Sequence, residues 1–309
     1  MIFKEKNFVS AVVYVRNDMN EINSFLTMLY NVLKEKFEKF EIICVNDCSK
    51  DNSKEVVLKF ADSIEDCILS IVNMSYWQGV EAAMHAGVDL AIGDFVFEFD
   101  SIVMDYEPNL IMQVYNRSLQ GFDIVSCGKS NMRFSSRLFY FVFNQISDAQ
   151  LKLKSETFRI LSRRAINRVH SMSAHMPYRK ALYSNCGLKT DFIGYTSMDA
   201  GKKRKQKRAF KNPGDTAFTT LILFTDAAYR ISVFFSIMMS VFMFGFGLFT
   251  VIVYFSSMDL TVGWAPLMGL LSAGFCGVFI VLTIIIKYID TLLKGIFNRQ
   301  AYLISSIDK

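Results

Sequence analysis

Hydrophobic and polar positions follow a repeating order along the first hundred residues. Four short apolar runs, rich in branched side chains, predict strands at 8–15, 40–46, 67–73 and 94–100. Between them lie segments whose apolar residues recur three and four positions apart, which predicts helices at 22–37, 54–64 and 80–91. After these elements the pattern indicates a helix at 108–120, a strand at 122–128 and an aromatic amphipathic helix at 136–147.

This alternation of strand and helix is typical of an α/β domain. It predicts a parallel sheet with helices on both faces. In such sheets ligands bind beyond the carboxyl ends of the strands. The loops that follow the first, second, third and fourth predicted strands are therefore expected to line a site.

Two long segments near the carboxyl end carry no charge. They span residues 231–255 and 264–286, and each is long enough to cross a hydrocarbon core of about 30 Å as a helix. Buried helices of a soluble domain are the alternative, but such helices almost always keep one polar face. Arg230 and Lys287 flank the outer ends, so both flanks are expected in the cytoplasm.

The chain is thus expected to be an integral membrane protein with two transmembrane helices and both termini in the cytoplasm. The apolar stretch near the amino terminus is too short, and a charge follows it too early, for a secretory signal. The expected parts are a cytosolic domain at 1–215, an amphipathic juxtamembrane segment at 216–230, a membrane hairpin at 231–286 and a cytosolic tail at 287–309.

Charge and cysteine content narrow the classes of function. The 34 basic and 29 acidic residues leave a net charge of +5, and a basic run at 201–215 precedes the first apolar segment. This run is expected to attract anionic lipid headgroups, at about 1 kcal/mol per basic residue. It gives only non-specific attraction to nucleic acid, so no nucleic-acid partner is expected. The six cysteines are scattered without a zinc or disulfide pattern.

Two aspartates stand at the ends of neighbouring predicted strands. Asp47 follows the second strand and Asp100 ends the fourth. A carboxylate in this position can hold a divalent cation, which neutralises the diphosphate of a nucleotide leaving group. Asp47 also lies in a turn-rich stretch where such side chains cap turns and helix starts. Both readings of Asp47 stay open.

Several motifs resemble those of the family 2 glycosyltransferases. Tyr14-Val15-Arg16-Asn17-Asp18 is similar to the family's P-x-Y-N-E, and residues 45–53, VNDCSKDNS, are similar to V-D-D-G-S-x-D-x-T. The stretch from Gln78 to Asp94 is similar to N-x-G-x-x-x-A-x-x-x-G-x-x-x-A-x-G-D. The resemblance implies a GT-A nucleotide-diphospho-sugar transferase domain with a mixed, Rossmann-like sheet, followed here by two transmembrane helices.

Further motifs resemble the membrane branch that includes dolichol-phosphate mannosyltransferase and bactoprenol glucosyltransferases. Residues 136–144 are similar to S-x-x-F-Y-x-x-x-N, residues 158–164 to the segment F-R-L-x-x-R, and residues 288–302 to the tail of that branch. This resemblance implies inverting transfer of a sugar from a UDP- or GDP-sugar to a polyprenyl phosphate, such as undecaprenyl or dolichyl phosphate, at the cytoplasmic membrane face. The sequence names neither the sugar nor the polyprenol.

The resemblance also implies roles for particular residues. Asp100 is the expected catalytic residue and metal ligand, for Mg²⁺ or Mn²⁺. The expected nucleotide-binding residues are Tyr14, Asn17, Asp18, Asp47, Ser49 and Gln78. The expected phosphate-binding residues are Arg133, Ser136, Arg137, Arg159, Lys203 and Arg204.

The sequence departs from the family pattern at the metal motif. The D-x-D-x-Q of the family is Asp100-Ser101-Ile102-Val103-Met104 here, so Ile102 replaces the second acid. A single aspartate binds a divalent cation poorly, because such ions require several oxygens. Asp105 or Glu107 are the nearest substitutes. A glycine of the family pattern is Cys48, and an aspartate is Thr157.

Two functions remain open on these grounds. In one, the chain is an active transferase in which the basic residues 202–211 supply the charge that a metal otherwise would. In the other, it is a catalytically degenerate relative that acts as a membrane partner or scaffold in glycan assembly. A homo-oligomer is possible because small residues such as Gly245, Gly247 and Gly269 favour packing between membrane helices.

Overall fold

The computed structural model describes residues 4–129, 156–172, 179–196 and 302–308, together with single helical positions between 234 and 292. The chain divides into two compact units. One contains Met1–Gln145, Ala149–Ala217 and Arg299–Lys309, and the other contains Ile146–Asp148 and Phe218–Asn298. The first unit holds all the strands of the described residues.

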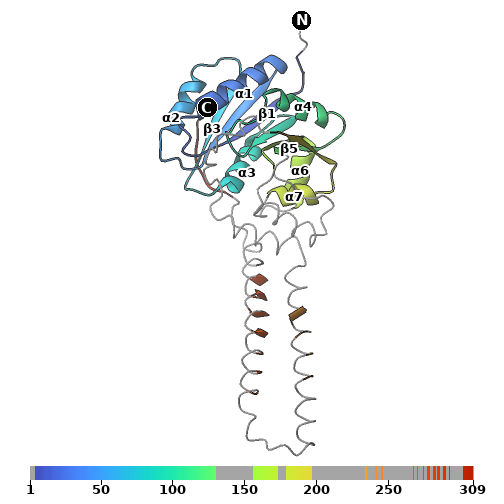
Figure 1. Ribbon diagram of the computed structural model, residues 1–309. Coiled ribbons are helices and arrows are strands. Elements are labelled where there is room, and N and C mark those ends of the chain that lie inside the picture. Colours follow the sequence, from blue (N-terminus) through green and yellow to red (C-terminus); the bar gives the residue numbers. More distant parts are fainter. Residues whose placement is uncertain are drawn as a thin grey trace, which may run out of the picture. The chain divides into compact units, whose positions relative to one another are not determined.

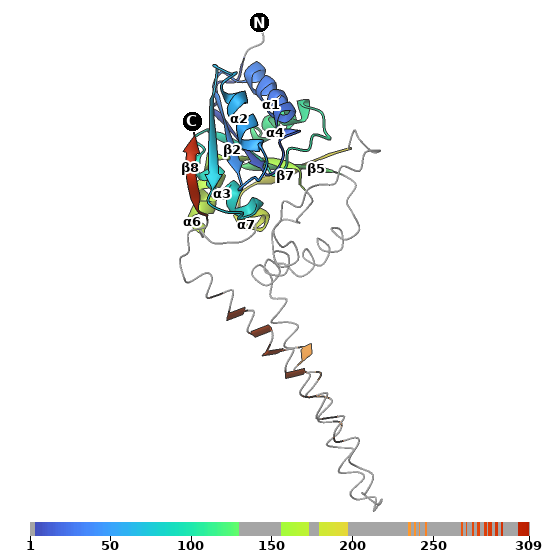
Figure 2. The ribbon, with the colours of Figure 1, turned by 90° about the vertical axis from the view of Figure 1, so that its left-hand side faces the viewer.

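These strands form one sheet (Figures 1 and 2). They are β1 (Val9–Val15), β2 (Phe40–Asn46), β3 (Ile68–Met74), β4 (Phe95–Phe99), β5 (Ile124–Lys129), β6 (Phe158–Ser162), β7 (Thr190–Tyr195) and β8 (Ile304–Asp308). Their order in the sheet is β7-β5-β6-β4-β1-β2-β3-β8.

The sheet is mixed. Strands β1 to β4 run parallel to one another, and β7 runs parallel to β5. Strand β6 lies between β4 and β5 and is antiparallel to both, while β8 is antiparallel to β3 at one edge. The carboxyl ends of β1 to β4 therefore meet at the same border of the sheet, where the amino end of β6 also lies.

Helices cover both faces of this sheet (Figure 1). They are α1 (Ile22–Lys36), α2 (Ser53–Ala61), α3 (Val80–Leu90), α4 (Asn109–Ser118), α6 (Arg163–Met172) and α7 (Arg179–Asn185).

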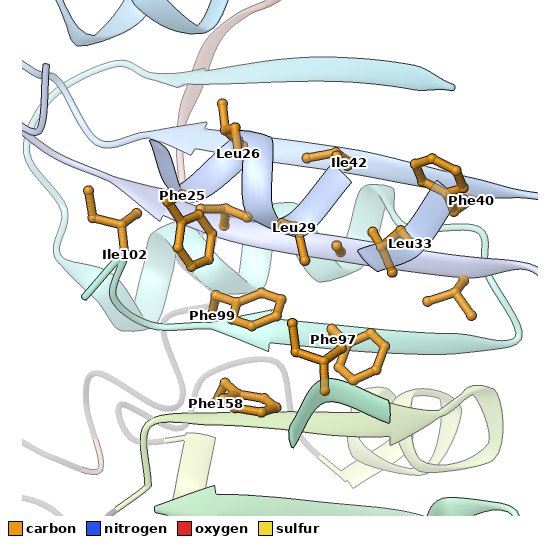
Figure 3. Packing of buried hydrophobic residues seen from close by; sticks show 14 of the residues in the cluster. Phe25, Leu26, Leu29, Leu33, Phe40, Ile42, Phe97, Phe99, Ile102 and Phe158 are labelled. Carbon is orange, nitrogen blue, oxygen red and sulfur yellow. The ribbon is translucent and has the colours of Figure 1, made fainter. Parts of the chain in front are cut away.

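A hydrophobic cluster lies between the sheet and helices α1, α2 and α4. Phe25 and Leu29 of α1 pack there with Phe97 and Phe99 of β4, and all four side chains are buried (Figure 3). The rings of Phe25 and Phe99 meet edge to face, with centroids 5.4 Å apart. Because side chains alternate along a strand, the intervening residue Glu98 points to the opposite face.

Helix α3 packs closely on that opposite face. A Cβ atom at Gly87 would lie 2.3 Å from Cγ1 of Val12 and 2.7 Å from Cγ2 of Val45. Only glycine allows the helix backbone to approach the sheet this closely. This approach brings the amino end of α3 against the border where β2 and β3 end.

The expected α/β fold is confirmed. The helices and strands predicted as far as residue 128 occur, with ends within about three residues of those expected. The parallel arrangement holds for β1 to β4, whereas β6 and β8 are antiparallel to their neighbours β4 and β3. The predicted helix at 136–147 lies outside the described residues, and β6, β7 and β8 were not predicted as strands.

The predicted membrane hairpin belongs to the second unit. Single positions between 234 and 292 are described there, and they are helical. Among the residues that the structure describes, no helix is both long and apolar enough to cross a bilayer. Most residues of the two predicted spans lie outside the described residues, so the hairpin stays a prediction.

Candidate active site

Asp47 joins three loops at the carboxyl border of β1, β2 and β3. Its side chain is fully buried. It accepts hydrogen bonds from the Tyr14 hydroxyl at 2.9 Å, the Gln78 backbone N–H at 2.8 Å and the Gly79 backbone N–H at 2.9 Å. The Arg16 guanidinium donates to the Asp47 carbonyl oxygen at 2.6 Å. Asp47 therefore sets the relative positions of the loops that follow these strands.

The hydroxyl of Tyr14 is held as a donor in this arrangement. Burial, and then the Asp47 charge, raise the pKa of Tyr14. Arg16 lies over the ring of Trp77 with its guanidinium carbon 4.3 Å from the ring centroid. This cation–π contact fixes the loop after β3 against the loop after β1.

The loops after β1 and β2 also bond directly to each other. The Asn17 backbone N–H donates to Ser49 Oγ at 3.1 Å, and Asn17 Oδ1 accepts from the Lys50 backbone N–H at 2.7 Å. The Asp18 backbone N–H donates to Ser53 Oγ at 2.7 Å. Four of the predicted nucleotide-binding residues, Asn17, Asp18, Asp47 and Ser49, thus lie in one bonded group of loops.

Backbone strain occurs within this group. Asn17 has φ of 52° and Cys48 has φ of 54°, and both are left-handed conformations. Asparagine tolerates this region, whereas a non-glycine residue such as cysteine pays about 1–2 kcal/mol for it. Strain of this kind is found most often at ligand sites.

Asp100 follows β4 and lies in a different environment. Its Oδ1 accepts from Arg179 Nη2 at 2.7 Å and its Oδ2 from Arg159 Nη2 at 2.9 Å. Glu98 accepts from the same guanidinium groups, at 2.5 Å from Arg179 Nη1 and 3.0 Å from Arg159 Nη1. The Tyr183 hydroxyl donates to Glu98 Oε1 at 2.9 Å. The two carboxylates and two guanidinium groups form one buried quartet.

Two further acids surround this quartet. Glu81 Oε2 accepts from both the backbone N–H and Nε of Arg179, each at 3.0 Å. Glu156 Oε2 lies 3.0 Å from Arg159 Nε, an ion-pair distance without hydrogen-bond geometry. Four carboxylates therefore face two guanidinium groups, and the buried Lys180 lies nearby. Both arginine side chains are only 1% exposed, so these bonds are shielded from water.

The charges of the arginines keep Asp100 ionised. Burial opposes the charged form, but Arg179 and Arg159 outweigh burial and hold the pKa of Asp100 well below its usual range. The side chain of Asp100 is 15% exposed, whereas that of Glu98 is fully buried. Asp100 is therefore the member of the quartet that reaches the border of the sheet.

The residues around Asp100 do not fit a divalent cation. Both of its oxygens already accept from guanidinium groups. Ile102, which replaces the second acid, is buried in the cluster with Phe97 and Phe99 (Figure 3). Within the described ranges, no group of three or more histidine, cysteine, aspartate or glutamate residues is arranged to hold a metal ion. A hard cation requires several oxygens at once, and the neighbouring carboxylates Glu81, Glu98 and Glu156 are paired with the same arginines.

The nearest substitute acid is also occupied. Asp105 is buried, accepts from the Tyr195 hydroxyl at 2.6 Å and pairs with Lys129. Glu107 is exposed on the surface.

The family model for glycosyl transferase family 2 matches residues 10–187. This match covers more than half of the chain and includes both Asp47 and Asp100. The chain belongs to glycosyl transferase family 2. Members of this enzyme family transfer sugars. The mixed α/β sheet of this chain agrees with the GT-A-like fold of the family.

Relatives of this family 2 glycosyltransferase are distant. An uncharacterised glycosyltransferase of Synechocystis is 27% identical over 60% of this chain and 59% of its own length. The uncharacterised glycosyltransferase YkcC of Bacillus subtilis is 24% identical over 96% of this chain and 92% of its own. A prophage bactoprenol glucosyl transferase homolog of Escherichia coli is 27% identical over 68% and 66%. The first and third matches thus span less than two thirds of those relatives.

Solved structures with a similar fold are more distant still. The glucosyl-3-phosphoglycerate synthase of Mycobacterium tuberculosis, in complex with phosphoglyceric acid, has a TM-score of 0.52 at 13% identity, over 71% of this chain and 80% of that one. A mannosyltransferase of Pyrobaculum calidifontis, in complex with GDP-Man and Mn²⁺, has a TM-score of 0.48 at 14% identity, over 94% and 76%. The first of these supports the fold class.

The predicted site residues of this glycosyltransferase fall into three groups. Tyr14, Asn17, Asp18, Asp47, Ser49 and Gln78 meet in the loops after β1, β2 and β3. Asp100 and Arg159, predicted as separate diphosphate and phosphate contacts, are bonded to each other. Arg133, Ser136, Arg137, Lys203 and Arg204 lie outside the described residues.

Sequence reasoning missed Glu98, Arg179, Tyr183 and Glu81. One signal was available for Glu98. It interrupts an apolar strand two positions before Asp100 and therefore points to the same face. No comparable signal marks Arg179, because it reaches Glu98 and Asp100 across about eighty residues of chain.

Proposed function

We propose that this glycosyltransferase transfers a sugar from a UDP- or GDP-sugar to a polyprenyl phosphate at the cytoplasmic face of a membrane, with inversion at the anomeric carbon. The observation that supports it best is the bonded group of loops around Asp47. These loops lie at the carboxyl border of parallel strands, the position where α/β folds bind nucleotides. The bactoprenol relative supports the choice of acceptor.

The proposed reaction requires alignment more than proton transfer. An oxygen of the acceptor phosphate forms a bond to the anomeric carbon while the bond from that carbon to the donor diphosphate breaks. The electron pair leaves with the nucleoside diphosphate. A phosphate monoester has a second pKa near 6, so it is already anionic at neutral pH and needs no protein base. Holding the two reactants in line lowers the barrier substantially.

The described residues would take the nucleotide part of the donor. Asn17, Asp18 and Ser49 line the loops after β1 and β2, and Asp47 holds those loops together. Tyr76, in the loop after β3, is 51% exposed and offers a ring on which a base can stack. Asp100, the catalytic residue expected from the resemblance, lies at the same border of the sheet. Because both of its oxygens accept from Arg159 and Arg179, its role in this proposal is to position these arginines.

Neutralisation of the leaving diphosphate is assigned to basic residues. The residues around Asp100 do not fit a metal ion, so the positive charge must come from other groups. The basic residues 202–211 of the sequence, which precede the predicted membrane hairpin, are proposed to supply positive charge. The same residues would attract the acceptor phosphate and the lipid headgroups.

A second candidate is a partner protein that has kept the fold and lost turnover. The burial of Ile102 and the pairing of Asp100 with two arginines favour it, because both remove ligands that the family pattern supplies. Such a protein would sit beside another glycan enzyme in the membrane.

The test uses the full chain purified in detergent. Undecaprenyl or dolichyl phosphate is mixed with a panel of labelled UDP- and GDP-sugars, once with Mn²⁺ and once with EDTA. We expect a lipid-soluble labelled product under both conditions. Arg117→Met, which alters an exposed ion pair on α4, serves as the matched active control. Absence of product across the panel, with no nucleotide-induced thermal shift, would favour the partner role.

A further inference from the structure

The end of the chain returns to the edge of the sheet. Residues 302–308 follow the predicted membrane hairpin in sequence, and β8 pairs antiparallel with β3 (Figure 2). The ladder between these strands has an irregular register at Asn73 and Met74. Beyond this irregularity the Ser75 backbone N–H donates to the Leu303 carbonyl oxygen at 3.0 Å.

The side chain of Gln78 continues this pairing. Its Nε2 donates to the Leu303 carbonyl oxygen at 2.7 Å, and its Oε1 accepts from the Leu303 backbone N–H at 2.9 Å. A primary amide carries one acceptor and a donor pair, so it bonds a peptide group in the way that a neighbouring strand would. Both ends of the Gln78 amide are therefore committed to the tail.

The backbone of Gln78 contacts the group of loops around Asp47. The N–H of Gln78 and that of Gly79 donate to the two oxygens of Asp47, which also accepts from Tyr14. A continuous chain of hydrogen bonds thus runs from Leu303 through Gln78 to Asp47. The loop between them, residues 75–79, carries Tyr76 and Trp77.

The tail has two further anchors. At one end the Tyr302 hydroxyl donates to Asp89 Oδ2 of α3 at 2.5 Å. At the other end Asp308 accepts from Asn73 Nδ2 at 3.0 Å and pairs with Lys54 at 2.7 Å. Asp308 lies several residues after Leu303 in the tail. Its contacts can therefore be removed without touching the contact between Leu303 and Gln78.

We propose that the backbone of Leu303 is part of the donor site, and that Gln78 is a positioning residue. Through its amide, Gln78 fixes the loop after β3 in the conformation in which its backbone bonds Asp47. The family resemblance instead assigns Gln78 to the nucleotide. This inference rests on the proposed function, since it takes the loops around Asp47 as the place where the nucleotide binds.

The experiment is a double-mutant cycle in the full chain, with UDP and GDP as probes. Dissociation constants are measured by calorimetry for the wild type, Gln78→Ala, Leu303→Pro and the double variant. Proline removes the N–H that Leu303 donates to Gln78 and leaves Gln78 itself intact. We expect each single variant to weaken binding about tenfold, the scale of one or two hydrogen bonds, and the double variant to weaken it no further.

Matched controls separate positioning from general damage. Leu303→Ala keeps the backbone N–H, and Asp308→Ala breaks the far anchor, so both are expected to bind within twofold of the wild type. Gln78→Glu keeps the acceptor for Leu303 N–H and is expected to lie between wild type and Gln78→Ala. Hydrogen exchange at the Gln78 and Gly79 amides should speed up in Gln78→Ala and Leu303→Pro but not in Asp308→Ala. This readout remains valid if a variant loses thermal stability.

Two results would overturn the inference, and they differ from failure of the proposed function. If Gln78 contacts the nucleotide directly, Leu303→Pro will bind like the wild type and the cycle will be additive. If both single variants bind like the wild type, the tail has no part in the donor site. If the wild type binds neither nucleotide, the proposed function fails as well, whatever the exchange data show.

Discussion

Asp47 and Asp100 occupy equivalent places, because each follows a parallel strand at the same border of the sheet, yet their surroundings differ. Asp47 accepts from a tyrosine hydroxyl and two backbone N–H groups. Asp100 accepts from two guanidinium groups. The first carboxylate organises loops, whereas the second balances buried charge.

This difference teaches that a strand-end aspartate does not by itself define a metal site. Both oxygens of Asp100 accept hydrogen bonds from arginines of β6 and α7. Glu98, two residues earlier in the chain, accepts from the same guanidinium groups. A buried charge group of this kind contributes little net stability when intact, but removal of one partner is costly because it leaves an uncompensated charge.

The largest effect is expected from Arg179→Met. This change leaves Glu81, Glu98 and Asp100 without their shared cation, so we expect a loss of about 3–5 kcal/mol in the free energy of unfolding. Urea denaturation, followed by a spectroscopic signal of the α/β domain, measures it. Arg117→Met is the control, because its pair with Asp191 is partly exposed and is expected to contribute about 0–1 kcal/mol. Equal losses in both variants would contradict the assignment of a buried quartet.

A smaller effect is expected from Asp47→Asn. An asparagine side chain has a single acceptor oxygen, so one of the N–H groups of Gln78 and Gly79 or the Tyr14 hydroxyl loses its partner. We expect a loss of about 1–3 kcal/mol in the free energy of unfolding, and faster hydrogen exchange in residues 75–79. Asp62→Asn, on an exposed residue after α2, should change neither. Unchanged exchange at Gln78 and Gly79 would show that Asp47 does not organise the loop.

Acid should gradually remove the contribution of Asp100 to stability. The folded pKa of Asp100 is depressed, against about 3.9 in an unfolded chain, so its contribution to stability is complete above about pH 4 and is lost as pH falls further. The stability difference between wild type and Asp100→Asn should be constant from about pH 5 to 7. It should shrink below pH 4 by at most about 1.4 kcal/mol per pH unit. A difference that stays constant down to about pH 2.5 would argue against the paired carboxylate.

The smallest effect is a gain in stability. Cys48→Gly relieves the left-handed conformation after Asp47, and we expect about 1 kcal/mol of stabilisation. Cys48→Ala keeps the strain and should show no such gain. Thermal unfolding distinguishes them. If alanine stabilises as much as glycine, the thiol rather than the backbone conformation is the cause.

Continuous apolar runs predicted the strands through residue 128, since strands such as β1 and β2 are buried on both faces. Helical periodicity predicted the helices, since burial on one face leaves a regular trace in sequence. The positions of Asp47 and Asp100 followed from that, because strand ends share a border in a parallel sheet. The sequence shows that Ile102 replaces an acid of the family pattern, but it does not show where the Ile102 side chain packs. Strand β4 ends at Phe99, so the alternation of faces no longer applies at residue 102, and the side chain joins the cluster on the other face.

What the sequence determined by itself was therefore the α/β fold, the loops expected to bind a nucleotide and the two uncharged segments. Only the tertiary structure decided that Arg159 and Arg179 meet Asp100, and that residues 302–308 join β3 and bond Gln78. The physical reason is that local spacing records which face of an element is buried. It carries no record of which distant charge or strand edge completes the pairing.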